Sequence, residues 1–289
     1  MHVAGWLHVL MAWRIANVQV WKRCAALIAF SFLQGSAGLT QSAMPTGNIL
    51  TRVLMVESRH GRGTIFSLDV DQREYWITAK HILTGAEHPP YGAVTDRSVT
   101  LRILNPEPQG EQWLPVNFSV IDPGNDIDIV VLVASQPILH DPLPSALTGS
   151  KGLYFGGDCE FLGFPFGGGW RATYADGQSI WMPYVKHCTV SGQKAGEPIF
   201  WVLDGINNFG FSGGPVIFRT GTEQAIFAVV SGFVSEPAEV ISSSTPKSAP
   251  TKKGTHKEKV NVNSGFIIAF DISYAMKAIH NSPIGPLRK

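Results

Sequence analysis

Short runs of β-branched and aromatic residues recur along most of the chain, and turn-forming residues separate them. Typical runs are "NILTRVLMV", "GTIFSLDV", "REYWITA", "DIVVLVA", "CEFLGF", "PIFWVL" and "QAIFAVVSGFV". Apolar runs of this length, bounded by Gly, Pro, Asn and Asp, are typical of β-strands. Many such strands without helical periodicity between them predict an all-β protein built as barrels or sandwiches.

A helical pattern stands out only near the end of the chain, in "DISYAMKAIH". The apolar residues at helical spacing in this stretch are Ile272, Ala275, Met276 and Ile279. Asp271 stands where a helix N-cap is expected, because its short side chain can accept a hydrogen bond from the first turn. We therefore expect one short C-terminal helix.

Two stretches interrupt the strand pattern. Residues 134–150 include three prolines, and we expect them to link two structural units. Residues from 235 to about 262 are rich in Ser, Pro and Lys and lack periodicity, so they are predicted to form a mobile loop.

The first 43 residues have the layout of an export signal. Basic residues precede the apolar run "CAALIAFSFL", and small and polar residues follow it. A run of about ten apolar residues is too short for a bilayer core, which needs about twenty. We expect a signal cleaved after Ala37 or Ala43, an exported protein, periplasmic or secreted, and no stable membrane insertion after cleavage. An uncleaved signal would retain the protein at the membrane.

Removal of that segment leaves two cysteines, Cys159 and Cys188. An oxidising compartment would permit a disulfide between them, and two buried free thiols are the alternative. Sequence separation alone does not decide between the two.

Composition excludes several classes of function. The chain has 289 residues, 44% of them hydrophobic, and a net charge of +1 with most basic residues dispersed. It therefore lacks the basic footprint of a nucleic-acid-binding protein. It also lacks metal-ligand spacing, a phosphate-cradling loop and a cofactor fingerprint, so we expect neither a metal nor a cofactor.

The serine in "GFSGGP", residues 210–215, fits two different nucleophile motifs. One is the elbow of an α/β-hydrolase, which needs a helix directly behind the serine and its histidine later in the chain. Gly213, Gly214 and Pro215 disfavour a helix directly behind Ser212. The only histidines after Ser212 in the sequence are His256 and His280. The pattern therefore disfavours an α/β-hydrolase esterase.

The other motif is that of a protease whose histidine and acid precede the serine. "YWITAKHIL" supplies His81 at the end of a predicted strand, and "NDIDIVVLVAS" supplies Asp128 just before a buried one. With Ser212 they stand in the order His, Asp, Ser of a catalytic triad. Asp126 is a rival for the acid, since alternation along the strand puts both aspartates on the same side.

Several motifs together resemble those of trypsin-like serine peptidases of the chymotrypsin fold, in particular the bacterial HtrA-like branch. These motifs are "TAKH", "DIVVLV", "FLGFPFG", "DGINNFGFSGGPV" and "NSGFIIAFDI", and the resemblance spans about residues 48–282. It implies two antiparallel six-stranded β-barrels followed by a short helix, with the barrels at residues 46–140 and 150–285. Too little chain follows for the PDZ domain of that branch, so we expect none.

The resemblance also implies roles for individual residues. Ser212 would be the nucleophile, His81 the general base, and Asp128 the acid that orients the His81 ring. Asp128 is preferred to Asp126 because the run "IVVLV" that follows Asp128 matches the family's apolar strand. The backbone N–H groups of Gly210 and Ser212 would form the oxyanion hole. The expected substrate is a polypeptide.

The expected substrate pocket departs from the digestive members of the family. Phe211 replaces the aspartate that receives a newly cut N-terminus there, so we expect no activation by that route. The remaining pocket residues carry no charge and imply an apolar or small residue before the cut: Ile206, Asn207, Ser231, Phe233 and Gly265. A catalytically silent binding module is the alternative function, and the sequence leaves the oligomeric state open.

Overall fold

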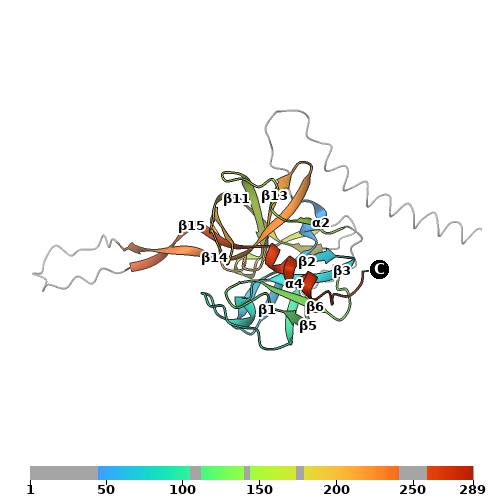
Figure 1. Ribbon diagram of the computed structural model, residues 1–289. Coiled ribbons are helices and arrows are strands. Elements are labelled where there is room, and N and C mark those ends of the chain that lie inside the picture. The colour runs from blue at the N-terminus through green and yellow to red at the C-terminus, as the bar shows by residue number, and fades with distance from the viewer. Residues whose placement is uncertain (1–44, 105–111, 140–143, 174–178, 241–258, 289) are drawn as a thin grey trace, which may run out of the picture. The chain divides into compact units, whose positions relative to one another are not determined.

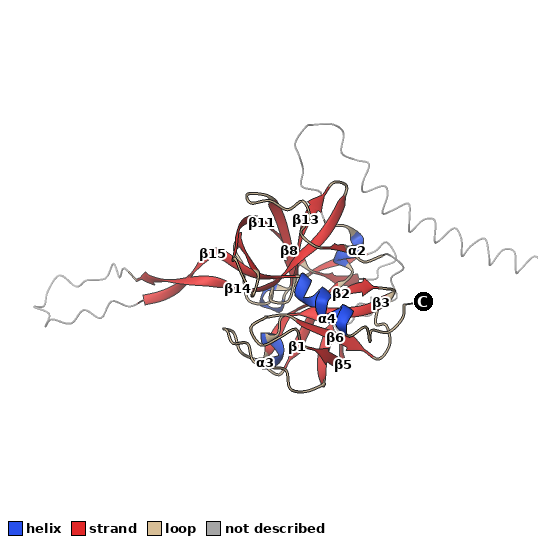
Figure 2. Ribbon diagram, in the orientation of Figure 1, coloured by secondary structure: helices blue, strands red, loops and turns tan. Residues whose placement is uncertain are grey.

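The computed structural model describes residues 45–104, 112–139, 144–173, 179–240 and 259–288. The predicted export segment lies outside the described residues, and so does most of the predicted loop. The stretch from Pro45 onward forms one compact unit in which strands predominate (Figure 2).

Six antiparallel strands in the first half of this unit close into a barrel, in the order β1-β2-β3-β6-β5-β4 (Figure 1). They are β1 (Val53–Ser58), β2 (Gly61–Val70), β3 (Arg73–Thr78), β4 (Ser98–Leu104), β5 (Trp113–Ile121) and β6 (Val130–Ala134). Strand β6 is buried at every position. Val130 and Leu132 face the barrel interior, whereas Val131 and Val133 join a second apolar cluster. Burial on both faces explains the uninterrupted apolar run in this strand.

A second ring of six strands follows, in the order β13-β8-β11-β12-β15-β14, and antiparallel pairing of β13 with β14 closes it. A short strand, β7, pairs in parallel with β14. The strands are β7 (Leu147–Thr148), β8 (Asp158–Gly163), β11 (Tyr184–Gln193), β12 (Phe200–Asp204), β13 (Pro215–Thr220), β14 (Glu223–Glu239) and β15 (Lys259–Asp271). The predicted all-β architecture of two six-stranded antiparallel barrels is confirmed.

The remaining elements are short. They are α2 (Gly47–Leu50), α3 (His81–Thr84), the 3-10 turn η1 (Pro165–Gly167), the hairpin of β9 (Trp170–Thr173) and β10 (Ser179–Met182), and α4 (Ser273–Asn281). The predicted C-terminal helix is α4. Its N-cap is Ile272 and not Asp271, which lies one residue earlier; the Asp271 carboxylate still accepts a hydrogen bond from the N–H of Ser273 at 2.9 Å. None of the helices in the described ranges is long and apolar enough to cross a membrane.

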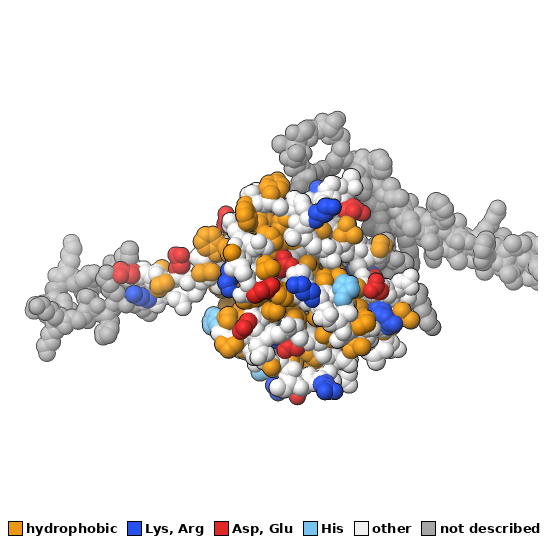
Figure 3. Space-filling model, viewed as in Figure 1, with side chains coloured by type: hydrophobic (Ala, Val, Ile, Leu, Met, Phe, Trp, Pro, Cys, Tyr) orange, Lys and Arg blue, Asp and Glu red, His pale blue; other side chains and the backbone are white. Residues whose placement is uncertain are grey.

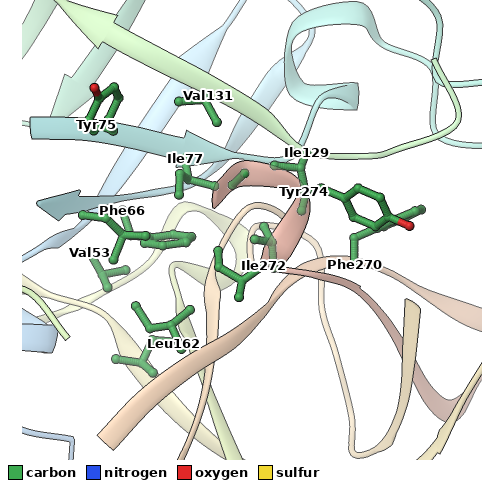
Figure 4. Close-up of a cluster of buried hydrophobic side chains, with 14 of the residues drawn as sticks. Val53, Phe66, Tyr75, Ile77, Ile129, Val131, Leu162, Phe270, Ile272 and Tyr274 are labelled. Atoms are coloured by element: carbon green, nitrogen blue, oxygen red, sulfur yellow. The ribbon is translucent and has the colours of Figure 1, made fainter. Parts of the chain in front are cut away.

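Buried side chains form three clusters. One fills the first barrel around Trp76 and Phe118, and another fills the second around Phe161 and Phe227. The third combines residues of both barrels with α4; Figure 4 shows Phe66 and Ile77 of the first barrel, Leu162 of the second, and Tyr274 of the helix. This shared cluster fixes the two barrels against each other, and thereby the residues that each contributes to a common site.

The structure forms the disulfide that the sequence left open. Cys159 of β8 and Cys188 of β11 lie directly opposite in the antiparallel register, with their Cα atoms 4.9 Å apart, and they are bonded. Both are buried in the core of the second barrel.

Strands extend into the stretch that the sequence predicts as a loop from residue 235. Ser235 to Glu239 pair with Asn263 to Lys259 as a two-stranded ribbon, and only residues 241–258 between them lie outside the description. Alternate apolar residues such as Val260 and Val262 support strand structure here, although Ser, Pro and Lys dominate the composition of the whole stretch.

The face of the molecule in Figure 3 carries Lys, Arg, Asp and Glu side chains of both signs close to one another. A large patch of one sign is not seen on this face, in keeping with the dispersed charges of the sequence.

Candidate active site

His81 and Asp128 lie in contact at the edge of the first barrel. His81 opens helix α3 just after strand β3, and Asp128 is fully buried ahead of β6. The Nδ1 atom of His81 lies 2.7 Å from Oδ2 of Asp128, and the backbone N–H of His81 donates to Oδ1 at 2.8 Å. Because a carboxylate only accepts hydrogen bonds, this contact places the ring proton on Nδ1 and leaves Nε2 as the acceptor.

The two candidate acids have different surroundings. Asp126 is exposed, whereas Asp128 is the aspartate that contacts His81. Lys80, which is fully buried, pairs with Asp122 at 2.5 Å and donates to the carbonyl of Gly124. This ion pair fixes the turn that leads into Asp128, because a buried ammonium needs its partners in place.

Ser231 of the second barrel completes the surroundings of Asp128. Its hydroxyl donates to Oδ2 of Asp128 at 2.5 Å, so the carboxylate is held from both barrels. The sequence placed Ser231 in the substrate pocket, but its side chain lies on the carboxylate. The sequence reasoning missed Tyr91, which is buried and whose phenol shares a hydrogen bond with the Ser231 side chain. Burial raises the pKa of Tyr91.

Ser212 lies in the loop between β12 and β13. Its hydroxyl donates to the backbone carbonyl of Ser231 at 3.0 Å, and among the described residues it makes no hydrogen bond to His81. Ser212 thus lies next to Ser231, whose side chain binds Asp128, and the Ser212 hydroxyl points to the Ser231 carbonyl and not to His81.

Thr64 of strand β2 binds the loop between β12 and β13 (residues 205–214), which we call the serine loop, to the first barrel. Its hydroxyl donates to the carbonyl of Gly210 at 2.7 Å, and its backbone N–H donates to the carbonyl of Ser212 at 2.8 Å. The same hydroxyl accepts from the N–H of Phe164 at 3.2 Å, and the side chain is fully buried. Sequence reasoning missed Thr64, since a threonine in a predicted strand carries no distinguishing signal.

The amides of Gly210 and Ser212 are free to bind a ligand. The carbonyl of Phe209 accepts from Phe166 at 2.7 Å, and the carbonyl of Phe211 accepts from Gly214 at 2.8 Å. In a planar trans peptide the N–H points away from the carbonyl. The N–H groups of Gly210 and Ser212 therefore point away from these contacts, and within the described ranges neither donates a hydrogen bond.

Glycine is required twice in this loop. Gly210 has a φ of 103°, and a Cβ there would lie 2.2 Å from the carbonyl oxygen of Phe164. Gly213 has a φ of 83°, and a Cβ there would lie 2.2 Å from the carbonyl oxygen of Thr64. Both the backbone conformation and the close approach of these carbonyl oxygens exclude a side chain.

Phe211 anchors the loop in the second barrel. It is fully buried, and its ring meets that of Phe161 edge to face at 4.8 Å. Lys186 of β11 approaches the same place: its ammonium lies 5.8 Å from the centre of the Phe211 ring, donates to the carbonyl of Ile206, and lies 3.2 Å from Oδ1 of Asn208. Partial burial lowers the pKa of Lys186.

The predicted pocket residues other than Ser231 lie near one another. Gly205 donates to the carbonyl of Gly265 at 2.8 Å, and Ile206 Cδ1 lies 3.9 Å from the position of a Cβ on Gly265. Asn207 is buried, and within the part of the chain described here its Oδ1 has no hydrogen-bond partner. The ring of Phe233 packs against that of Phe209, with centres 5.7 Å apart. Phe209, which the sequence reasoning did not single out, thus lies against one of the predicted pocket residues.

The site contains no candidate metal centre: across the described ranges, no group of three or more His, Cys, Asp or Glu residues could hold a metal ion.

Solved structures similar to the chain include two proteases, Rv3671c and AlgW, and Deg5. Rv3671c from M. tuberculosis H37Rv in an inactive form is 15% identical, with a TM-score of 0.44 over 86% of this chain and 100% of that one. The HtrA-type protease AlgW with a tripeptide is 16% identical, with a TM-score of 0.48 over 82% of this chain and 61% of AlgW. Deg5 is 19% identical, with a TM-score of 0.41 over 63% of this chain and 80% of Deg5. No protein-family model and no curated protein matches the sequence.

Proposed function

We propose that the protein is an exported serine endopeptidase that cleaves polypeptides through His81, Asp128 and Ser212. The observation that carries the proposal is the contact of His81 with a fully buried Asp128, held by Ser231, whose carbonyl in turn binds the Ser212 hydroxyl. A buried carboxylate on Nδ1 leaves Nε2 of the histidine free to act as a base. The export part of the proposal rests on the N-terminal segment and on the disulfide.

In this mechanism the Ser212 hydroxyl first turns about its Cα–Cβ bond from the Ser231 carbonyl toward His81. Its oxygen attacks the scissile carbonyl carbon while Nε2 of His81 takes its proton. The amides of Gly210 and Ser212 donate to the oxyanion of the tetrahedral intermediate. The C–N bond then breaks, and Nε2 gives the proton to the departing amine. Water hydrolyses the acyl-enzyme ester by the same steps and restores the hydroxyl.

Labelling with a fluorophosphonate probe tests the proposal directly. We expect the protein to be labelled at Ser212, and we expect Ser212→Ala and His81→Ala to remain unlabelled. Incubation with a peptide library should then give cleavage after apolar or small residues, with Ser212→Ala as the control.

A second candidate function is a binding module that keeps the fold without catalysis. The observation in its favour is that the Ser212 hydroxyl donates to Ser231 and not to His81. A folded protein that neither labels nor cleaves, and that behaves like its Ser212→Ala variant, would support this second function.

A further inference from the structure

The hydrogen bonds around Asp128 continue beyond Ser231 to a buried tyrosine. Tyr91 lies in the segment between α3 and β4, is only 5% exposed, and shares a hydrogen bond between its phenol and the Ser231 side chain. Ser231 in turn donates to Oδ2 of Asp128 at 2.5 Å, and the same oxygen contacts Nδ1 of His81 at 2.7 Å. A continuous chain of hydrogen bonds therefore runs from Tyr91 to His81.

The directions of these hydrogen bonds follow from the protons that are available. A carboxylate only accepts, so the single proton of the Ser231 hydroxyl lies toward Asp128. The Ser231 oxygen is then the acceptor in its bond with Tyr91, and the phenol is the donor. Burial and the nearby charge of Asp128 raise the pKa of Tyr91, so the phenol keeps the proton that it donates.

Contacts with both barrels fix the Tyr91 side chain. Its ring meets that of Phe270, in β15, edge to face with the centres 5.7 Å apart. Its backbone N–H donates to the carbonyl of Asn125 at 3.1 Å, in the turn ahead of Asp128. Tyr91 also belongs to the buried cluster that combines residues of both barrels with α4. The phenol therefore has little freedom to move away from Ser231.

The phenol affects the carboxylate through the hydroxyl between them. A hydroxyl that accepts a hydrogen bond becomes a better donor, because hydrogen bonds in a chain polarise one another, and a buried site enlarges this effect. Tyr91 therefore strengthens the hydrogen bond from Ser231 to Asp128. Asp128 is fully buried, so its charge depends on the donors that surround it.

We propose that Tyr91 is a positioning residue of the triad: by donating to Ser231 it holds Asp128, and through Asp128 the His81 ring, in the geometry that acyl transfer needs. This inference rests on the proposed function. Tyr91 is buried and reaches the triad through Ser231, so it does not touch the substrate. Its loss should therefore lower kcat and leave KM almost unchanged.

Tyr91→Phe tests the role of the phenol, because it removes the hydroxyl and keeps the ring. We expect kcat for peptide cleavage to fall about threefold to tenfold, which corresponds to one net hydrogen bond. Steady-state kinetics on one peptide from the library measure kcat and KM separately.

Tyr75→Phe is the matched control. Tyr75 is also buried, belongs to the same cluster, and accepts a hydrogen bond on its phenol from the N–H of Gly285 at 3.2 Å. The control thus loses a buried hydroxyl and a hydrogen bond, but outside the chain that leads to Asp128. We expect both variants to unfold at lower urea concentration than wild type, and Tyr91→Phe alone to lose kcat. Equal losses of kcat in the two variants would show an effect of stability and refute the role of Tyr91.

Ser231→Ala tests the route of the effect. Without the Ser231 hydroxyl the phenol has no path to Asp128, so Tyr91→Phe should lower kcat no further in the Ser231→Ala background. The same loss in both backgrounds would mean that Tyr91 acts through packing, and would overturn the inference.

The ring proton of His81 gives a readout that does not depend on cleavage. A ring N–H held by a buried carboxylate resonates downfield of the backbone amides in a proton NMR spectrum. We expect Tyr91→Phe to shift this resonance and Tyr75→Phe to leave it in place. If Tyr91→Phe changes neither the resonance nor kcat, the inference is wrong and the proposed function stands. If the resonance shifts but wild type cleaves no peptide, the proposed function is wrong and the hydrogen-bond chain from Tyr91 to His81 stands.

Discussion

Thr64 offers a sharp test of how the serine loop is held. Replacement by valine keeps the β-branched shape but removes the hydroxyl that bonds the carbonyl of Gly210 and the N–H of Phe164. The backbone N–H of residue 64 still reaches Ser212, so only the side-chain contacts are lost. Both backbone partners would then be buried without a hydrogen bond.

The structure sets the size of the effect. A buried backbone group left unsatisfied costs about 1 to 3 kcal/mol, so two such groups lower the free energy of unfolding by about 2 to 6 kcal/mol. If the loop relaxes and the Gly210 amide moves, kcat falls by up to about 100-fold to 1,000-fold, the cost of one oxyanion donor. We expect a smaller change in KM.

Urea unfolding and peptide cleavage measure the two effects. Thr64→Ser is the matched control, because it keeps the hydroxyl and loses only a methyl group, which costs about 1 kcal/mol. With a slope of about 3 kcal/mol per molar urea, the valine variant should unfold at least about 0.7 M earlier than wild type. Equal unfolding midpoints and equal kcat for the two variants would refute the role of the hydroxyl.

Two further predictions concern the second barrel. Lys186→Met removes the charge-assisted hydrogen bonds to the Ile206 carbonyl and the Asn208 side chain, and it should lower kcat/KM about tenfold to 100-fold. Lys186→Arg is the control and should retain more activity. Equal steady-state kinetics of Lys186→Met and wild type would contradict this prediction. Loss of the Cys159 to Cys188 disulfide, which closes a loop of 29 residues, should lower the free energy of unfolding by about 3.6 kcal/mol on the chain-entropy estimate. The double alanine variant should unfold earlier than the oxidised protein, and an unchanged midpoint after reduction would count against the bond.

The strand pattern of the sequence was enough to predict the all-β architecture, because apolar alternation and turn residues are local properties. The ribbon was missed for the same reason: Ser, Pro and Lys dominate residues 235–262 as a whole, and the few alternating valines gain their meaning only when the two strands pair. The disulfide stayed open until the register placed Cys159 opposite Cys188.

The sequence by itself also singled out the candidate catalytic residues, through the glycine and proline residues around Ser212 and the histidine and aspartate ahead of it. Alternation puts Asp126 and Asp128 on the same side of a strand, so the sequence favoured Asp128 only through the family resemblance; the tertiary structure shows that Asp128 is the aspartate in contact with His81. It also revealed Thr64, which is 146 residues from the glycine that it holds. Contacts between barrels join segments distant in the chain, and no local periodicity records which side chains will meet there.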